Sequence, residues 1–257
     1  MREKIKKIAD FVLQYLMETG KDKSNDVWGP KYRWEHTLRV AYWAWRLALE
    51  ENADVEKCVV AALFHDISHF VSEDYRKHGI RSADIAKDFL LREDRPEDFV
   101  EDVEYAIRSH VGEHHPRTVE AKILQDADTI DRFGYFRILL FGKTAELSSL
   151  ERLKEKAQSS LEYIRKVEAG DFGRMWTKTG ERKLKELVSI NKKIPNGVLG
   201  SWITQKDPRS TAKNSLNPIL QPKEDTKPER NQLSLETFAK LILSACSHSS
   251  QAVFGSV

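Results

Sequence analysis

The sequence contains few cysteines and no long apolar run. Its only two cysteines, Cys58 and Cys246, lie far apart and in no metal-binding or redox spacing, which argues against a disulfide scaffold and against a structural zinc site with cysteine ligands. No apolar run reaches the roughly 20 residues that span a bilayer. The first residues, MREKIKKIADF, follow a charged helical pattern rather than that of a signal peptide. We therefore expect a globular cytoplasmic protein that does not bind a membrane.

An excess of one charge is also missing. The chain has 42 Lys and Arg residues against 40 Asp and Glu, and residues 1–194 alone contain 35 of each. A protein dedicated to duplex nucleic acid usually has a basic excess, because phosphate neutralisation supplies much of its affinity. The charge balance therefore argues against dedicated duplex binding. The sequence also has no glycine-rich phosphate loop and no internal repeat.

Apolar residues recur every three or four positions through residues 1–194, and no segment alternates with period two, so we predict an all-α fold. The first predicted helix ends at Gly20, and a polar loop continues to about Tyr32. Further helices are expected at about 34–50, 78–91, 97–110 and 118–134, together with two long charged segments that end near Lys193. The segment CVVAALFHDI is apolar on all sides, which indicates a central helix whose last turn carries His65 and Asp66.

The composition changes at Pro195. Five of the eight prolines lie between there and the end, among Ser, Asn, Lys and Gln residues. We therefore predict a main domain at 1–194 and an irregular tail at 195–257. A short amphipathic helix near 234–245 either docks or recruits a partner, or belongs to a weakly ordered extension without function.

Four residues carry the strongest chemical signal: His36, His65, Asp66 and Asp128. A His-Asp pair at the end of an apolar helix is hard to explain by packing, because a buried carboxylate costs several kcal/mol unless a cation or hydrogen-bond donors compensate it. A metal ion provides that compensation. Imidazole and carboxylate ligands suit a divalent ion such as Mn²⁺, Fe²⁺, Co²⁺, Ni²⁺, Zn²⁺ or Mg²⁺. We expect one tightly held ion per chain, with the identity of the metal left open.

Four separated motifs occur in a fixed order: HTLRVA, AALFHDI, HGIRSA and EAKILQDADTIDRFG. In this order they resemble the HD-domain metal-dependent phosphohydrolases, and among these the small stand-alone HD hydrolases. The resemblance covers about residues 30–190 and implies a helical bundle with His36, His65, Asp66 and Asp128 as metal ligands. Asp126 competes with Asp128, and Asp128 is preferred because the family places a polar or acidic residue three positions after the ligand, here Asp131.

The resemblance also implies a role for the segment after the His-Asp pair. His69 and Asp74 match positions that move protons on the metal-bound water or the leaving group, with Glu73 as a rival to Asp74 and a helix-capping role as the alternative for His69. An ordinary histidine pKa of about 6.5 would suit His69 to this role at neutral pH.

Several other residues are weaker candidates. His78 and His110 would bind phosphate or a second metal ion. Arg39 and Arg81, like Lys77 and Arg132, would neutralise phosphate oxygens or are solvated charges. His114 and His115 are interpreted as loop residues.

Together these features predict a metal-dependent phosphohydrolase that cleaves a phosphate ester or anhydride of a small molecule, most plausibly a nucleotide. The alternative is a regulatory HD module that binds a metal or nucleotide without turnover and uses its tail to bind a partner. The sequence leaves the leaving group and the oligomeric state open.

Overall fold

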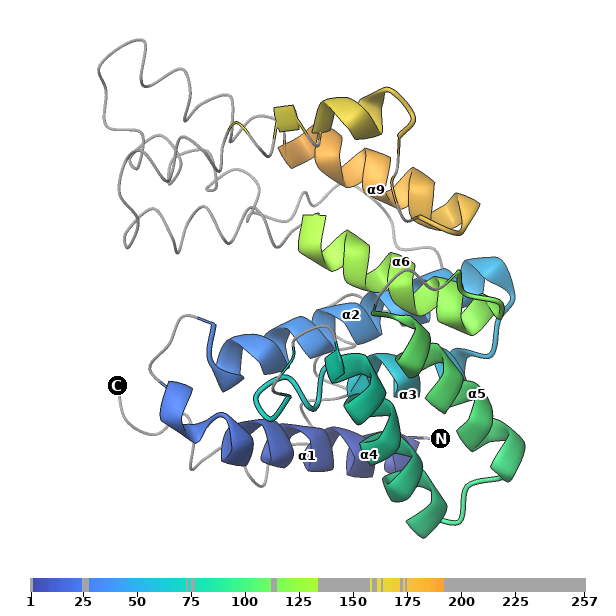
Figure 1. Ribbon diagram of the computed structural model, residues 1–257. Helices are drawn as coiled ribbons and strands as arrows, with labels where there is room; N and C mark the ends of the chain where they lie inside the picture. Colours follow the sequence, from blue (N-terminus) through green and yellow to red (C-terminus); the bar gives the residue numbers. More distant parts are fainter. Residues whose placement is uncertain are drawn as a thin grey trace. The chain divides into compact units, whose positions relative to one another are not determined.

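The computed structural model describes residues 2–24, 28–72, 74, 77–111, 115–133, 158, 161–162, 164–171, 173 and 175–191. Over these residues the chain forms helices and no strand, which confirms the predicted all-α class (Figure 1). The chain divides into two compact units, and the second begins at Asp128. The predicted tail from Pro195, with its short helix, lies outside the described residues.

Helix α3 (Val55–Phe64) is the apolar centre of the first unit. Asp54 caps its start, because the carboxylate accepts a hydrogen bond of 3.0 Å from the Lys57 backbone N–H. Every residue from Cys58 to Phe64 is buried, as expected for a helix that is apolar all round. Four helices contact α3 (Figure 1): α1 (Arg2–Thr19), α2 (Pro30–Glu51), α4 (His78–Arg92) and α5 (Glu97–Ser109).

Two helix ends differ from the sequence prediction. Helix α2 begins at Pro30, inside the segment expected to be a polar loop, because proline fits the first turn of a helix, where its missing N–H is not needed. His36 therefore lies in the second turn of α2 rather than in the first. Helix α3 ends at Phe64, so His65 and Asp66 follow the helix instead of forming its last turn. Residues 65–71 make a series of turns.

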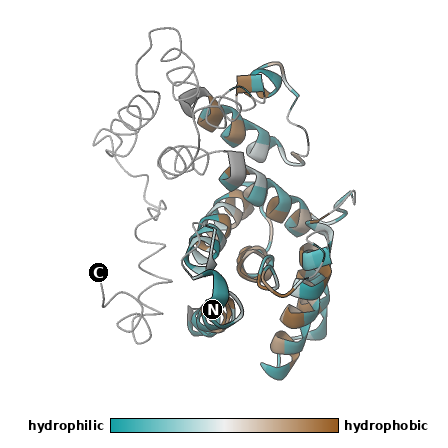
Figure 2. Cartoon of the chain, turned by 60° about the vertical axis from the view of Figure 1, so that its left-hand side comes forward, coloured by the Kyte–Doolittle hydropathy of each residue, from teal (hydrophilic) through white to brown (hydrophobic). Residues whose placement is uncertain are grey.

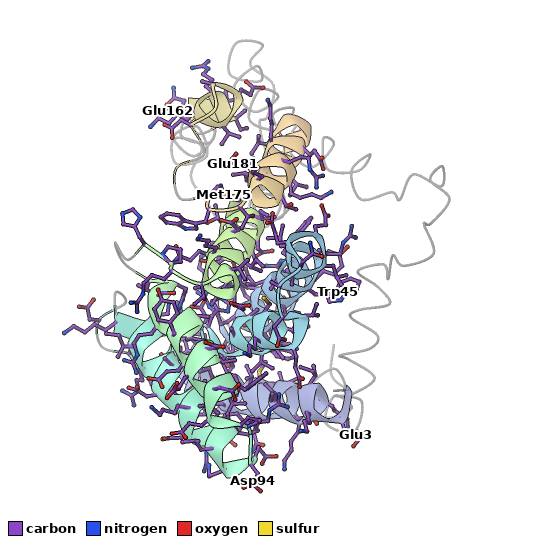
Figure 3. All side chains as sticks on the ribbon, turned by 90° about the vertical axis from the view of Figure 1, so that its right-hand side faces the viewer. Glu3, Trp45, Asp94, Glu162, Met175 and Glu181 are labelled. Carbon is purple, nitrogen blue, oxygen red and sulfur yellow. The ribbon has the colours of Figure 1, made fainter. Side chains whose placement is uncertain are left out.

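The helices predicted at about 78–91, 97–110 and 118–134 agree closely with the structure, whereas residues 134–157, part of the two long charged segments, lie outside the described residues. Helices α4 and α5 begin at the expected residues, and α4 is followed by a turn in which Asp94 adopts a left-handed conformation with φ of 50°. Figure 3 labels Asp94 in this turn. Helix α1 ends at Thr19, and a Cβ atom on Gly20 would lie only 2.9 Å from Leu16 O and from the Phe70 ring. Gly20 therefore ends the helix at a point where a side chain would clash with the Phe70 ring.

Helix α6 (Val119–Phe133) contains the boundary between the two units, and α9 (Lys178–Asn191) belongs to the second unit. Leu184 and Val188 are buried in α9, and Val167 is buried in the helical stretch before it. Figure 2 shows hydrophobic and hydrophilic residues on different sides of the helices. Among the described helices, none combines the length and the apolar character needed to cross a membrane.

Candidate metal centre

His65 directly follows the last residue of α3, and the end of that helix orients its ring. The last carbonyls of a helix have no partner within the helix, so a side chain can bond to them. The ring atom Nδ1 of His65 lies 2.6 Å from the Ala62 carbonyl oxygen, which can only accept, so Nδ1 donates. In the neutral ring the other nitrogen, Nε2, therefore carries a lone pair. His65 is fully buried, which fixes the direction of that lone pair.

His110 repeats this arrangement at the end of α5. It follows Ser109, the last residue of the helix, and its Nδ1 lies 2.5 Å from the Ile107 carbonyl oxygen. The donor is again Nδ1, so Nε2 is left as the acceptor. Two helix ends thus present two histidine Nε2 atoms in the tautomer that binds metal ions, each held by a backbone carbonyl in the way usual for metal-ligating histidines.

Asp66 lies between two pairs of histidines. Its Oδ2 atom is 3.4 Å from His36 Nε2 and 3.5 Å from His65 Nε2. The two Nε2 atoms are 3.2 Å apart. We call His36, His65 and this oxygen the His36 group.

The other carboxylate oxygen faces the second pair. Asp66 Oδ1 is 2.8 Å from His78 Nε2 and 3.7 Å from His110 Nε2, and these nitrogens are 3.2 Å apart. Helix α4 supplies His78 at its first residue. We call His78, His110 and Asp66 Oδ1 the His78 group.

Each group has the donor chemistry of a site for a divalent ion. Two imidazole nitrogens and one carboxylate oxygen converge, all within 4.8 Å of one another. His36, His65, Asp66 and His78 are buried, so their polar atoms need partners inside the protein. Mixed nitrogen and oxygen ligands suit a borderline divalent transition ion. The residues therefore fit two ions that share Asp66.

Arg33, which sequence analysis did not single out, also contacts this carboxylate. Its Nη1 forms an ion pair with Asp66 Oδ2. Burial raises the pKa of the Asp66 carboxyl, but the permanent charge of Arg33 and the charge that His65 carries when protonated, together with the nearby ring nitrogens of His110 and His36, lower it by more. The pKa of Asp66 therefore lies well below its usual range. Asp66 is therefore ionised at neutral pH, as a metal ligand must be.

Comparisons with known proteins agree with this centre. The HD domain family matches residues 33–132, a segment that includes both histidine pairs. A crystal structure of a predicted HD superfamily hydrolase from an uncultured Thermotogales bacterium matches with a TM-score of 0.51 and 25% identity, over 75% of this chain and 91% of that one. Residues 33–132 of this chain form an HD domain. The resemblance to HD-domain proteins inferred from the four motifs is thereby confirmed.

Curated relatives of this HD domain are longer proteins. Ribonuclease Y of Acidothermus cellulolyticus is 34% identical over 143 residues, which make up 54% of this chain and 27% of the relative. Ribonuclease Y of Desulforudis audaxviator is 34% identical over 120 residues, or 46% of this chain and 22% of the relative. The chain thus spans about a quarter of the length of these relatives.

His69, the predicted proton-transfer residue, lies beside the candidate metal centre. Arg33 Nη2 donates to its Nε2 over 3.0 Å, and its ring packs edge-on against that of His78. Burial, followed by the charge of Arg33, lowers the pKa of His69 to about 4. The expectation of an ordinary pKa is therefore wrong, because the ring is partly buried beside a permanent cation. Asp74 lies in the following turn and is half-buried, while Glu73 lies outside the described residues.

The predicted ligand Asp128 lies on α6, as do its rival Asp126 and the later Asp131. All three carboxylates are buried, so burial does not separate Asp128 from Asp126. Asp128 is the first residue of the second unit, whereas both histidine groups belong to the first unit. Its role as a ligand remains a proposal that rests on the motif.

The weaker candidates divide into two kinds. The structure brings His78 and His110 to Asp66, whereas Arg81 is exposed and donates to the Val71 carbonyl oxygen at 3.0 Å. Arg39 is half-buried on α2. His115 is exposed, and His114 lies outside the described residues.

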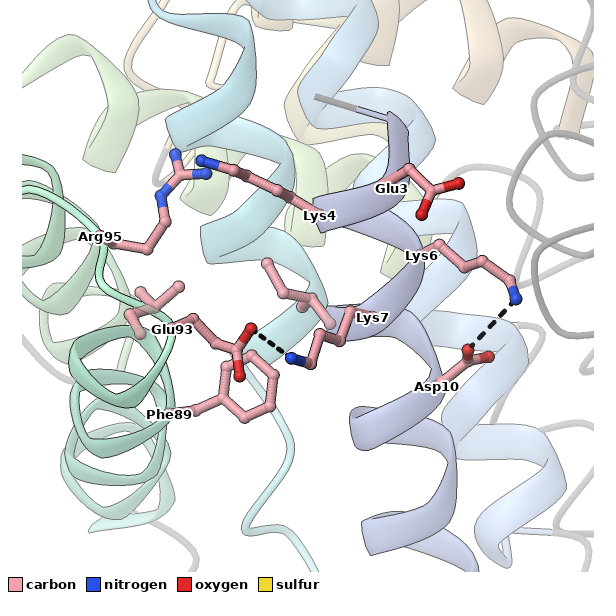
Figure 4. Close-up of a pocket in the computed structure, with 10 residues that line it drawn as sticks. Glu3, Lys4, Lys6, Lys7, Asp10, Phe89, Glu93 and Arg95 are labelled. Carbon is pink, nitrogen blue, oxygen red and sulfur yellow. Dashed lines mark ion pairs between the residues drawn. The ribbon is translucent and has the colours of Figure 1, made fainter.

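A separate pocket of about 380 Å³ lies between α1 and the end of α4 (Figure 4). Its charged side chains are largely paired: Lys7 with Glu93 at 2.6 Å, and Lys6 with Asp10 at 3.9 Å. None of the residues that line it belongs to the His36 or the His78 group. The pocket therefore adds nothing to the metal centre.

Proposed function

We propose that this chain is a metal-dependent phosphohydrolase that cleaves a phosphate ester or anhydride of a nucleotide at two divalent ions. The observation that carries the proposal is the position of Asp66 between two histidine pairs, one at each carboxylate oxygen. Sequence analysis expected one ion, and the His78 group adds the ligands for a second. Asp128 is proposed as a further ligand on the strength of its motif.

The chain's own residues prepare this chemistry. Divalent ions held by the two groups would neutralise phosphoryl oxygens and lower the pKa of a bound water toward neutrality. The bonds from His65 Nδ1 and His110 Nδ1 to backbone carbonyls hold both rings in their ligating orientation. His69 is the proposed base that accepts a proton from the attacking water at Nε2, and Asp74 is proposed to support it. This role requires that Arg33 no longer donates to Nε2 and that the lowered pKa of His69 rises once the nearby charge of Arg33 is withdrawn.

The choice of a nucleotide rests on the family and on the relatives. The HD domain supports a hydrolase, and the curated relatives are named as ribonucleases. A ribonuclease cleaves a phosphodiester bond between nucleotides. This likeness favours phosphate esters of nucleotides over those of other small molecules.

A substrate panel tests the proposal. The chain is stripped of metal, reloaded with Mn²⁺, and incubated with nucleoside mono-, di- and triphosphates, cyclic nucleotides and a short RNA, while phosphate, pyrophosphate and nucleotide products are measured. We expect turnover of at least one class, which Asp66→Asn abolishes. Asp102→Asn is the matched control, because Asp102 is half-exposed and pairs with Lys57 at 2.7 Å. Metal-loaded protein that turns over no member of the panel would contradict the proposal and favour a regulatory HD module.

A further inference from the structure

Arg33 contacts both Asp66 and His69 at the edge of the candidate metal centre. It lies one turn before His36 on α2, and residues three apart share a face of a helix. Its side chain is 13% exposed, so it lies at the edge of the buried cluster. Nη1 pairs with Asp66 Oδ2 and Nη2 donates to His69 Nε2, whereas Nε is buried without a hydrogen-bond partner among the described residues.

The oxygen that Arg33 contacts is the one that completes the His36 group. A divalent ion in that group needs Asp66 Oδ2 together with His36 Nε2 and His65 Nε2. A guanidinium keeps its positive charge at every pH that a folded protein tolerates, so it cannot be neutralised to make room for the ion. Two cations in a buried site repel each other more strongly than they would in water. Arg33 and an ion in the His36 group therefore compete for one oxygen.

We propose that Arg33 is a placeholder cation that neutralises Asp66 while the His36 group holds no ion and releases Oδ2 when an ion binds. This inference rests on the proposed metal centre and specifies what controls its affinity. The Nε atom of Arg33 favours release. It is a buried donor without a hydrogen-bond partner among the described residues, and the free-energy cost of burying it destabilises the position that Arg33 occupies beside Asp66. The contact with Oδ2 ties the competition to the His36 group, since the His78 group uses Oδ1.

The opposite role makes the opposite prediction. If Arg33 only oriented Asp66 for the metal, its removal would weaken metal binding. If Arg33 competes, its removal strengthens metal binding and destabilises only the metal-free protein, in which Asp66 then loses its counter-charge. The direction of the change in Mn²⁺ affinity therefore shows whether Arg33 competes with the ion for Asp66 or orients Asp66 for it.

The test compares Arg33→Met and Arg33→Gln with wild type by Mn²⁺ titration calorimetry and by thermal melts with and without Mn²⁺. A neighbouring arginine changes the proton affinity of a carboxylate by about one to three pKa units, so we expect one of the two Mn²⁺ ions, the one held by the His36 group, to bind at least about ten-fold more tightly in both variants. The melting temperature should fall without metal and recover with it. Arg46→Met is the control, because Arg46 lies on the same helix and bonds to Tyr42 at 3.3 Å.

The possible results are distinct. Unchanged or weaker Mn²⁺ binding by the Arg33 variants, with normal binding by wild type, would overturn the placeholder role and leave the metal centre intact. Absence of Mn²⁺ binding by wild type would overturn the proposed metal centre itself. Arg33→Gln retains hydrogen-bonding capacity, so it provides the answer if Arg33→Met fails to fold.

Discussion

Gly79 leaves the space that the ring of His110 occupies. A Cβ atom at position 79 would lie 3.1 Å from His110 Cε1, 3.2 Å from His110 Nδ1 and 2.9 Å from Val111 Cγ2. These contacts are tighter than packed atoms normally make, so a larger residue would displace the ring or the turn that carries it. The glycine after His78 in the HGIRSA motif thus allows α4 and the end of α5 to bring their histidines together.

We therefore expect Gly79→Ala to weaken the His78 group without altering any ligand. The displaced His110 ring would lose its alignment with Asp66, whereas His36 and His65 come from other elements and should keep theirs. Elemental analysis of metal-reloaded protein should show one ion fewer per chain than wild type. Ile80→Ala is a suitable control because Ile80 is the exposed neighbour on α4. Wild-type metal content in Gly79→Ala would show that the turn adapts to the extra methyl group.

His69→Ala should separate proton transfer from metal binding. His69 bonds to Arg33 and is not a member of either ligand group, so metal content should stay the same. Loss of general-base help typically lowers turnover by about 10²- to 10⁴-fold, and we expect a fall in this range with little change in KM. The exposed His115 provides the control variant His115→Ala. If His69→Ala turns over substrate at the wild-type rate, His69 has only a structural role.

Arg95→Met should destabilise the fold without affecting the metal centre. The buried Arg95 guanidinium pairs with Glu56 at 2.8 Å and lies 3.9 Å from the centre of the Phe99 ring. Breaking a buried ion pair leaves a charge without its partner, and because Glu56 is partly exposed we expect a loss of about 2–4 kcal/mol in the free energy of unfolding.

Urea unfolding would measure this loss against Lys7→Met, a change in the same pocket (Figure 4). Lys7 is 64% exposed and pairs with Glu93, so its removal should cost less than about 1 kcal/mol. Equal stability of the two variants would show that the Arg95 pair contributes no more than a surface pair.

The sequence predicted the helices of the first unit well because their apolar spacing is regular. Helices α4 and α5 begin at the predicted residues, whereas the start of α2 was placed four residues late, since Pro30 looks the same in a loop as in a first helical turn. The His36 group could be predicted because its residues form an ordered motif. Arg33 could not, because an arginine in a helix usually means a solvated charge, and only the fold shows that it meets Asp66.

The second ligand group was only partly predictable. His78 and His110 are 32 residues apart and lie at the start of one helix and the end of another. Their spacing alone allowed phosphate binding as readily as metal binding, and the packing of α4 on α5 decides that both face Asp66. The lowered pKa of His69 likewise depends on burial and on Arg33, neither of which can be read from neighbouring residues in the sequence.

The central claim is that Asp66 is shared by two ions, and metal stoichiometry tests it most directly. Wild type, His36→Ala, His110→Ala and Asp66→Ala are reloaded with Mn²⁺, checked for helical content by circular dichroism, and analysed by elemental mass spectrometry. The account predicts two ions per chain in wild type, one in each histidine variant and none in folded Asp66→Ala. Retention of both ions by folded Asp66→Ala, or a single ion in wild type that His110→Ala leaves in place, would contradict it.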